Sequence, residues 1–140
     1  MEFVGVAATI GCVALFWIVM RHSPRIWELE ALDRLIAENP AWAKYRDPIV
    51  AARQGMKQAP TPEQKAMWAS RLHDARVAAG WQVQSYLVWQ RVPRDAADNT
   101  TRSPQRMREI QEDVARSATL DPDVLSAADL ALRARLLPPG

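Results

Sequence analysis

The sequence predicts an all-α protein, in which a single N-terminal transmembrane helix is followed by four or five short helices. Three observations favour this fold class. Residues 3–20 carry no charged side chain. Beyond them, Ser-Pro, Thr-Pro and Asp-Pro pairs recur in a pattern typical of helix starts. The apolar residues after each pair repeat at spacings of three and four.

The apolar segment 3–20 is long enough to cross a thin bilayer. At about 1.5 Å per residue it extends about 27 Å, close to the hydrocarbon thickness of a membrane. A signal peptide is the main alternative, but Met1-Glu2 carries no positive charge and the stretch IVMRHS is a poor cleavage site. We therefore expect residues 1–22 to form a transmembrane anchor.

The charges beside this segment predict its orientation. Arg21 and Arg25 follow it, and no Lys or Arg precedes it. By the positive-inside rule the N-terminus lies outside and the C-terminal region is cytoplasmic. Trp17 and Trp27 bracket the boundary as an aromatic belt does, so these four residues are the expected membrane-interface anchors.

One face of the expected anchor carries small residues, Ala7, Gly11 and Ala14, at helical spacing. Small residues allow the backbone of a second helix to approach closely. The sequence therefore predicts a helix-packing face here.

Two helices are expected directly after the anchor. The first begins at Ser23-Pro24 and reaches about Glu38. After a short turn, Asp47-Pro48 begins the second, which ends near Gln58.

The next helix has the best-defined start in the chain. Thr61, Pro62 and Gln64 match a capping box, and the apolar spacing continues to at least Ala79. Residues 81–91 are ambiguous because they alternate at first like a strand. We favour a continued helix, and the alternative is a strand that pairs with another subunit.

Two further helices are expected after a polar linker at residues 93–103. Ser103-Pro104 begins one, with Met107, Ile110 and Val114 inward, and Asp121-Pro122 begins the last, with Leu125, Leu132 and Leu136 on one side. The organisation predicted is an anchor (1–22), a helical membrane-proximal region (23–92), the linker (93–103) and a C-terminal hairpin-like region (104–140). These helices carry few large apolar residues, so we do not expect a large self-sufficient globular core.

Composition argues against several functions. The net charge of +2 is too balanced to indicate nucleic-acid binding. The chain has one cysteine, Cys12, and two histidines, His22 and His73, which are too few ligands for a typical zinc site. No nucleophile, phosphate-binding or metalloprotease motif is present. We therefore assign no catalytic, cofactor-binding or metal-binding residues, no cofactor and no small-molecule substrate, and predict that the protein is not an enzyme.

The six tryptophans point instead to contacts with other proteins, because Trp favours interfaces. The leading hypothesis is a small single-pass accessory subunit of a larger bacterial membrane protein complex. Two alternatives remain open: a phage-encoded membrane protein of the virion, ejection or lysis machinery, and a self-associating membrane-tethered adaptor. The expected partner contacts are Trp42, Trp68, Trp81 and Trp89.

Overall fold

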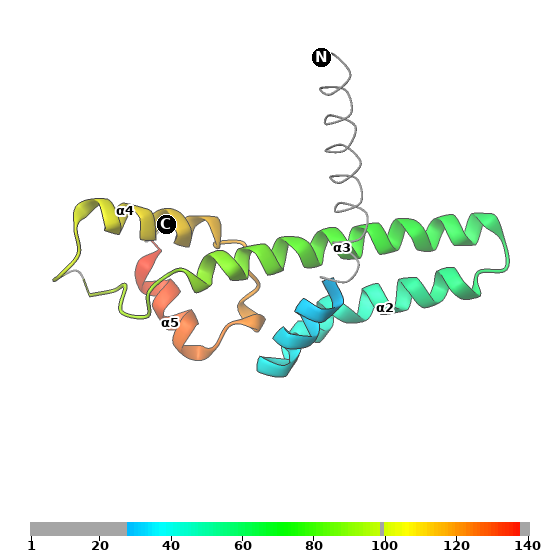
Figure 1. Ribbon diagram of the computed structural model, residues 1–140, viewed down its shortest axis with the longest axis horizontal. Coiled ribbons are helices and arrows are strands. Elements are labelled where there is room, and N and C mark those ends of the chain that lie inside the picture. The colour runs from blue at the N-terminus through cyan, green and yellow to red at the C-terminus, as the bar shows by residue number, and fades with distance from the viewer. Residues whose placement is uncertain (1–27, 99, 138–140) are drawn as a thin grey trace, which may run out of the picture.

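The computed structural model describes residues 28–98 and 100–137 (Figure 1). Every regular element within these residues is a helix, which confirms the all-α class. The elements in chain order are a helix over residues 28–38, the 3-10 turn η1 (Pro40–Trp42), α2 (Ala43–Gln58), α3 (Pro62–Gln90), α4 (Pro104–Arg116), the 3-10 turn η2 (Pro122–Val124) and α5 (Ala127–Leu136).

Helix α3 organises the molecule. Its 29 residues extend about 43 Å at the usual helical rise. Figure 1 shows α2 running antiparallel beside the first half of α3, so that the two form an extended two-helix arm, while α4 and α5 lie near the other end of α3. The prediction of short helices is thus wrong for α3.

The expected transmembrane anchor cannot be compared with this architecture. Residues 1–22 and the helix start at Ser23-Pro24 lie outside the described residues. Among the helices that the structure does describe, none combines the length and the apolar character needed to cross a bilayer.

Two of the predicted helix starts are confirmed by their capping hydrogen bonds. Thr61 Oγ1 accepts a hydrogen bond of 3.2 Å from the Gln64 backbone N–H, and Ser103 Oγ accepts one of 3.2 Å from the Arg106 N–H. Each cap satisfies a backbone donor that a first helical turn leaves unpaired. In α4, Ile110 and Val114 face inward as expected.

The two Asp-Pro pairs do not begin α-helices, which corrects the sequence-based boundaries. Helix α2 already begins at Ala43 and contains Pro48, because Asn39 caps η1 and η1 continues directly into α2. Asp121 caps only the short turn η2. The last helix starts at Ala127, where Ser126 provides the cap.

Residues 81–90 continue α3 as a helix, so the strand alternative is wrong. Val83 and Trp89 from this stretch are both buried in the core. Gly80 sits within α3 and does not interrupt it. Apolar and polar residues alternate from Trp81 onward, but helical spacing outweighs this pattern. It brings Leu72, Ala79 and Val83 to the buried side of α3.

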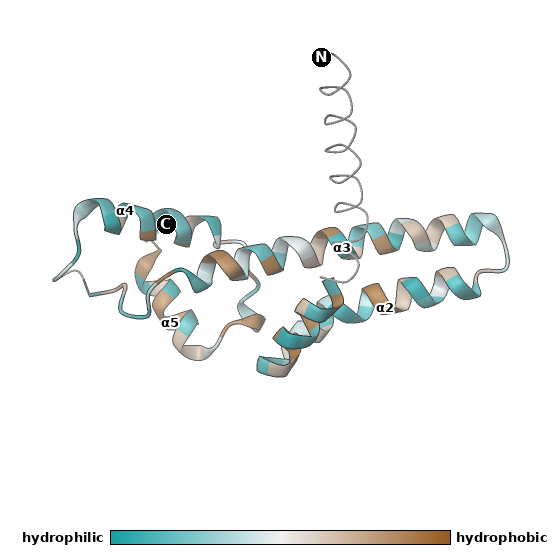
Figure 2. Cartoon of the chain, in the orientation of Figure 1, coloured by the Kyte–Doolittle hydropathy of each residue, from teal (hydrophilic) through white to brown (hydrophobic). Residues whose placement is uncertain are grey.

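The described helices enclose one shared hydrophobic core. Its largest fully buried side chains come from several of the described elements; among them are Trp42, Trp89, Leu32, Ile49, Ile110 and Leu120. The predicted linker (93–103) takes part as well, since Ala96 is buried, and so is Val92 directly before it. Trp42 and Trp89, which we expected to contact a partner, are the largest side chains in this core. Figure 2 shows that hydrophilic residues predominate along α4, whereas α2 mixes hydrophilic and hydrophobic residues.

Candidate functional site

The four tryptophans expected to contact a partner occupy different environments. Trp42 and Trp89 are 1% and 0% exposed, so both pack within this chain and present no surface to a partner. Trp68 is half-buried between the helices of the arm, where its ring lies 4.8 Å from the Arg71 guanidinium carbon. Trp81 is 67% exposed. Of the four, Trp81 alone offers most of its ring to solvent.

Trp81 belongs to an apolar outer face of α3. At about 100° per residue, Val77 and Trp81 fall on the same side of the helix, and Leu72, Ala79 and Val83 fall on the core side. Val77 is 47% exposed. We call Val77 and Trp81 the outer face of α3.

The remaining predicted site residues cannot be placed. The helix-packing residues Ala7, Gly11 and Ala14 lie outside the described residues, as do the membrane-interface anchors Trp17, Arg21, Arg25 and Trp27.

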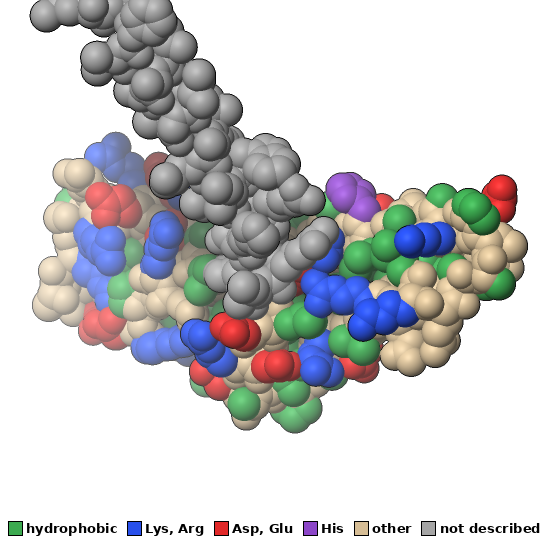
Figure 3. All heavy atoms as spheres, turned by 45° about the vertical axis from the view of Figure 1, so that its right-hand side comes forward, with side chains coloured by type: hydrophobic (Ala, Val, Ile, Leu, Met, Phe, Trp, Pro, Cys, Tyr) green, Lys and Arg blue, Asp and Glu red, His purple; other side chains and the backbone are tan. Residues whose placement is uncertain are grey.

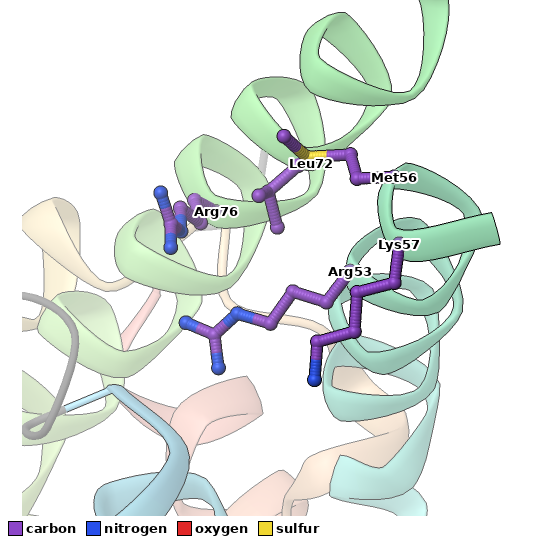
Figure 4. A pocket seen from close by; sticks show the side chains of 5 residues that line it. All are labelled: Arg53, Met56, Lys57, Leu72 and Arg76. Carbon is purple, nitrogen blue, oxygen red and sulfur yellow. The ribbon is translucent and has the colours of Figure 1, made fainter. Parts of the chain in front are cut away.

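A basic pocket opens between α2 and α3, near the first residues that the structure describes. Its volume is about 400 Å³ and its lining residues are Arg53, Met56, Lys57, Leu72 and Arg76. Figure 4 shows Arg53 and Lys57 extending from α2 and Arg76 from α3, while Met56 approaches Leu72. Figure 3 shows Lys and Arg side chains gathered on this arm. Cations and apolar side chains thus share one concave surface.

Glu28 lies at the edge of this pocket and contacts two of its cations. Its Oε2 is 3.2 Å from Arg76 Nε and 3.7 Å from Arg53 Nη2. The Glu28 side chain is 10% exposed, and its second oxygen, Oε1, is buried without a hydrogen-bond partner. One carboxylate therefore offsets two guanidinium groups, and Lys57 forms no ion pair with any described residue.

A second polar cluster joins the start of α2 to the segment before η2. Asp121 Oδ2 accepts a hydrogen bond of 2.6 Å from the Tyr45 hydroxyl and forms an ion pair with Lys44. Lys44 also contacts Asp123 at 3.0 Å. Gln82 of α3 accepts a hydrogen bond of 2.9 Å from the Asp121 backbone N–H.

The pKa values in this cluster reflect mutual stabilisation rather than poised acid–base chemistry. Burial would raise the pKa of Asp121, but hydrogen bonds from Lys44 and Tyr45 outweigh it and hold the pKa below its usual value. The hydrogen bond to Asp121 raises the pKa of Lys44. Burial and the same carboxylate raise the pKa of Tyr45 to about 12. All three groups keep their ordinary charge at neutral pH, so the cluster acts as a structural clamp.

Within residues 28–98 and 100–137, no three His, Cys, Asp or Glu side chains lie close enough to hold a metal ion. His73 lies exposed on α3.

The basic pocket is not apparent from the sequence. The spacing of Arg53 and Lys57, four residues apart, does indicate that both lie on one side of a helix. The contribution of Arg76 depends on how α2 packs against α3, which no local pattern reveals. Comparison with known proteins adds no guide here, since no family model, curated protein or solved structure matches this chain.

Proposed function

We propose that the protein is a small single-pass accessory subunit of a larger membrane protein complex and has no catalytic role of its own. Residues 1–22 anchor it, and the helical body lies on the cytoplasmic side of the membrane. The outer face of α3 docks against a helix of another membrane subunit. The anchor and its orientation rest on the uncharged segment 3–20 and on Arg21 and Arg25.

The exposure of Trp81 is the observation that carries the docking proposal. Trp buries a large area at interfaces and dominates many binding hot spots. Here its ring is 67% exposed and lies one turn from the exposed Val77. The same chain buries Trp42 and Trp89 completely in its own core. Trp81 therefore differs from the two core tryptophans, and its exposed ring can contact a partner.

The surroundings of Trp81 favour a protein partner over lipid. Asp74 and Gln84 lie exposed on the same side of α3, two turns before and one turn after Trp81 respectively. An ionised carboxylate is costly in hydrocarbon, whereas a polar rim around an apolar centre is typical of protein interfaces. A partner helix with an apolar face, and with a basic or amide side chain at the edge of that face, fits this pattern.

Co-purification in neutral detergent tests the proposal. The full chain should bring down a stoichiometric membrane protein, and Trp81→Ala should lose it while keeping its helical circular dichroism. Leu87→Ala is the matched control, because Leu87 is 47% exposed on a different side of α3. Benzoylphenylalanine placed at residue 81 should crosslink to the same partner. Equal recovery of that partner by both variants would contradict the proposed docking face.

A further inference from the structure

We propose that the basic pocket between α2 and α3 binds the phosphate group of an anionic lipid. Arg53, Lys57 and Arg76 would hold the phosphate, and Met56 and Leu72 would contact the apolar part of the same molecule. The lipid source rests on the membrane location proposed above. The phosphate chemistry rests on the pocket alone.

The size and composition of the pocket suit such a ligand. Its volume of about 400 Å³ lies within the usual range for small-molecule sites, about 300–1,000 Å³. Two of its five lining residues are apolar and three are cationic. A phosphate group with attached carbon chains matches both kinds of side chain, whereas a free phosphate ion would use only the cations.

The balance of charge leaves the pocket positive. Three cations line it, and one carboxylate, Glu28, contacts two of them. Glu28 engages Arg53 and Arg76 through one oxygen. A guanidinium has five N–H donors in a fixed fork, so both arginines retain donors for a phosphate. Lys57 forms no ion pair among the described residues and is the cation most available to a ligand.

The position of the pocket in the chain favours a lipid as the source of the phosphate. Arg53 and Arg76 both contact Glu28, which follows the segment that contains the expected anchor and its interface residues Arg25 and Trp27. The pocket thus lies where the chain leads toward the expected membrane surface. Headgroups of anionic lipids are concentrated at the cytoplasmic surface and attract basic side chains.

Native mass spectrometry of the full chain in neutral detergent tests this proposal. Phosphatidylglycerol and phosphatidylcholine are titrated separately, and inorganic phosphate is titrated by calorimetry. We expect phosphatidylglycerol to bind more tightly than phosphatidylcholine. Lys57→Gln should weaken phosphatidylglycerol binding about tenfold, the effect of losing one charge-assisted contact. Arg76→Gln should weaken it as well.

Lys65→Gln is the matched control. It removes the same charge from the same two-helix arm, but Lys65 does not line the pocket and has no ion pair with a described residue. Lys57 lies in the last turn of α2, where a cation also stabilises the helix, so the melting temperature of each variant is measured in parallel.

The possible outcomes separate the two sources. Lipid binding that depends on Lys57 and not on Lys65, without binding of inorganic phosphate, supports the proposal. Phosphate binding with the same dependence and no lipid preference supports the phosphate chemistry and overturns the lipid source. Equal effects of the pocket and control variants on both ligands overturn the proposal. The phosphate titration remains informative even if fractionation shows that the chain is not held in the membrane.

Discussion

The Tyr45 hydroxyl donates a hydrogen bond of 2.6 Å to Asp121, a residue 76 positions later in the chain. Tyr45 lies in the first turn of α2, and Asp121 caps η2. Through Gln82, which accepts a hydrogen bond from the Asp121 backbone and donates one of 3.1 Å to the Thr119 carbonyl, α3 joins the same cluster. One carboxylate therefore links the arm to the C-terminal helices.

Replacing Asp121 with Ala should lower the free energy of unfolding by about 1–2 kcal/mol at neutral pH, because Tyr45 loses its acceptor in a half-buried site. The pKa of Asp121 is lowered in the folded chain, so its contribution is present above the unfolded pKa of about 4 and is lost at lower pH. The melting temperature measured against pH gives both results.

At alkaline pH the stability changes in the opposite direction, because it falls as the pH rises. The folded pKa of Tyr45 is raised to about 12 and that of Lys44 is also raised. Their contribution is complete below the unfolded pKa values of about 10 and is lost as the pH rises further. The difference between wild type and Asp121→Ala should thus shrink below about pH 4 and above about pH 10. Asp47→Asn, at an exposed carboxylate, should change the stability at neutral pH by less than about 0.5 kcal/mol.

Gly55 should tolerate no larger residue. A Cβ atom at this position would overlap the Trp68 ring, lying 2.7 Å from its Cε3 atom. Gly55→Ala should therefore force α2 and α3 apart and destabilise the chain by about 1–3 kcal/mol, despite the better helix propensity of Ala. Urea unfolding followed by circular dichroism measures the change.

Gly80 provides the matched comparison within α3. Nothing lies within 4 Å of a Cβ atom built at Gly80, so Gly80→Ala should stabilise the helix by about 0.5–1 kcal/mol. A Gly55→Ala variant as stable as Gly80→Ala would exclude the close packing of Gly55 against Trp68.

The buried and exposed tryptophans should respond very differently to truncation. Trp89 is 0% exposed, so Trp89→Ala should cost about 3–5 kcal/mol, whereas Trp81→Ala should change stability by less than about 0.5 kcal/mol. Trp89 Nε1 is buried without a hydrogen-bond partner. Trp89→Phe removes that unpaired donor and should recover much of the loss. Denaturant midpoints of the three variants give this order, and a large loss for Trp81→Ala would place its ring in the core.

The all-α class and the starts of α3 and α4 could be predicted from the sequence, because these features depend on local chemistry. The caps at Thr61 and Ser103 and the inward residues Ile110 and Val114 follow from spacing within one segment. Asp121-Pro122 begins the 3-10 turn η2 and not an α-helix, because an aspartate cap and a proline suit both kinds of helix. Pro48 is accommodated inside α2 while neighbouring Trp42 and Ile49 pack in the core.

The candidate site was less predictable because it depends on tertiary packing. Trp42 and Trp81 look alike in the sequence, yet one is enclosed by other helices and the other faces outward. The pocket brings Arg53 and Arg76 together across two helices, with Glu28 from a third segment. This arrangement depends on the register of α2 against α3. The close approach of Trp68 to Gly55 restricts that register.

Glu28→Gln should loosen the fold and tighten anion binding at the same time. Removal of the carboxylate leaves Arg53 and Arg76 without their shared counter-ion, which should cost about 1–3 kcal/mol of stability. The pocket becomes more positive, so phosphatidylglycerol should bind more tightly in the native mass spectrometry titration. Glu30→Gln, at an exposed carboxylate paired only with Arg34 among the described residues, serves as control and should leave both quantities unchanged. Weaker lipid binding by Glu28→Gln in chains that remain folded would contradict a phosphate site at these arginines.

Labelling of a single engineered cysteine shows on which side of the membrane the helical body lies. Cys12 is first replaced by Ser, and Gln84, exposed on α3, by Cys. Bacterial cells that express this full-length variant are treated with a membrane-impermeant maleimide before or after lysis, and carbonate-washed membranes are analysed. We expect the chain to stay in the washed membranes and to be labelled only after lysis. Labelling in intact cells, or release of the chain by carbonate, would contradict it.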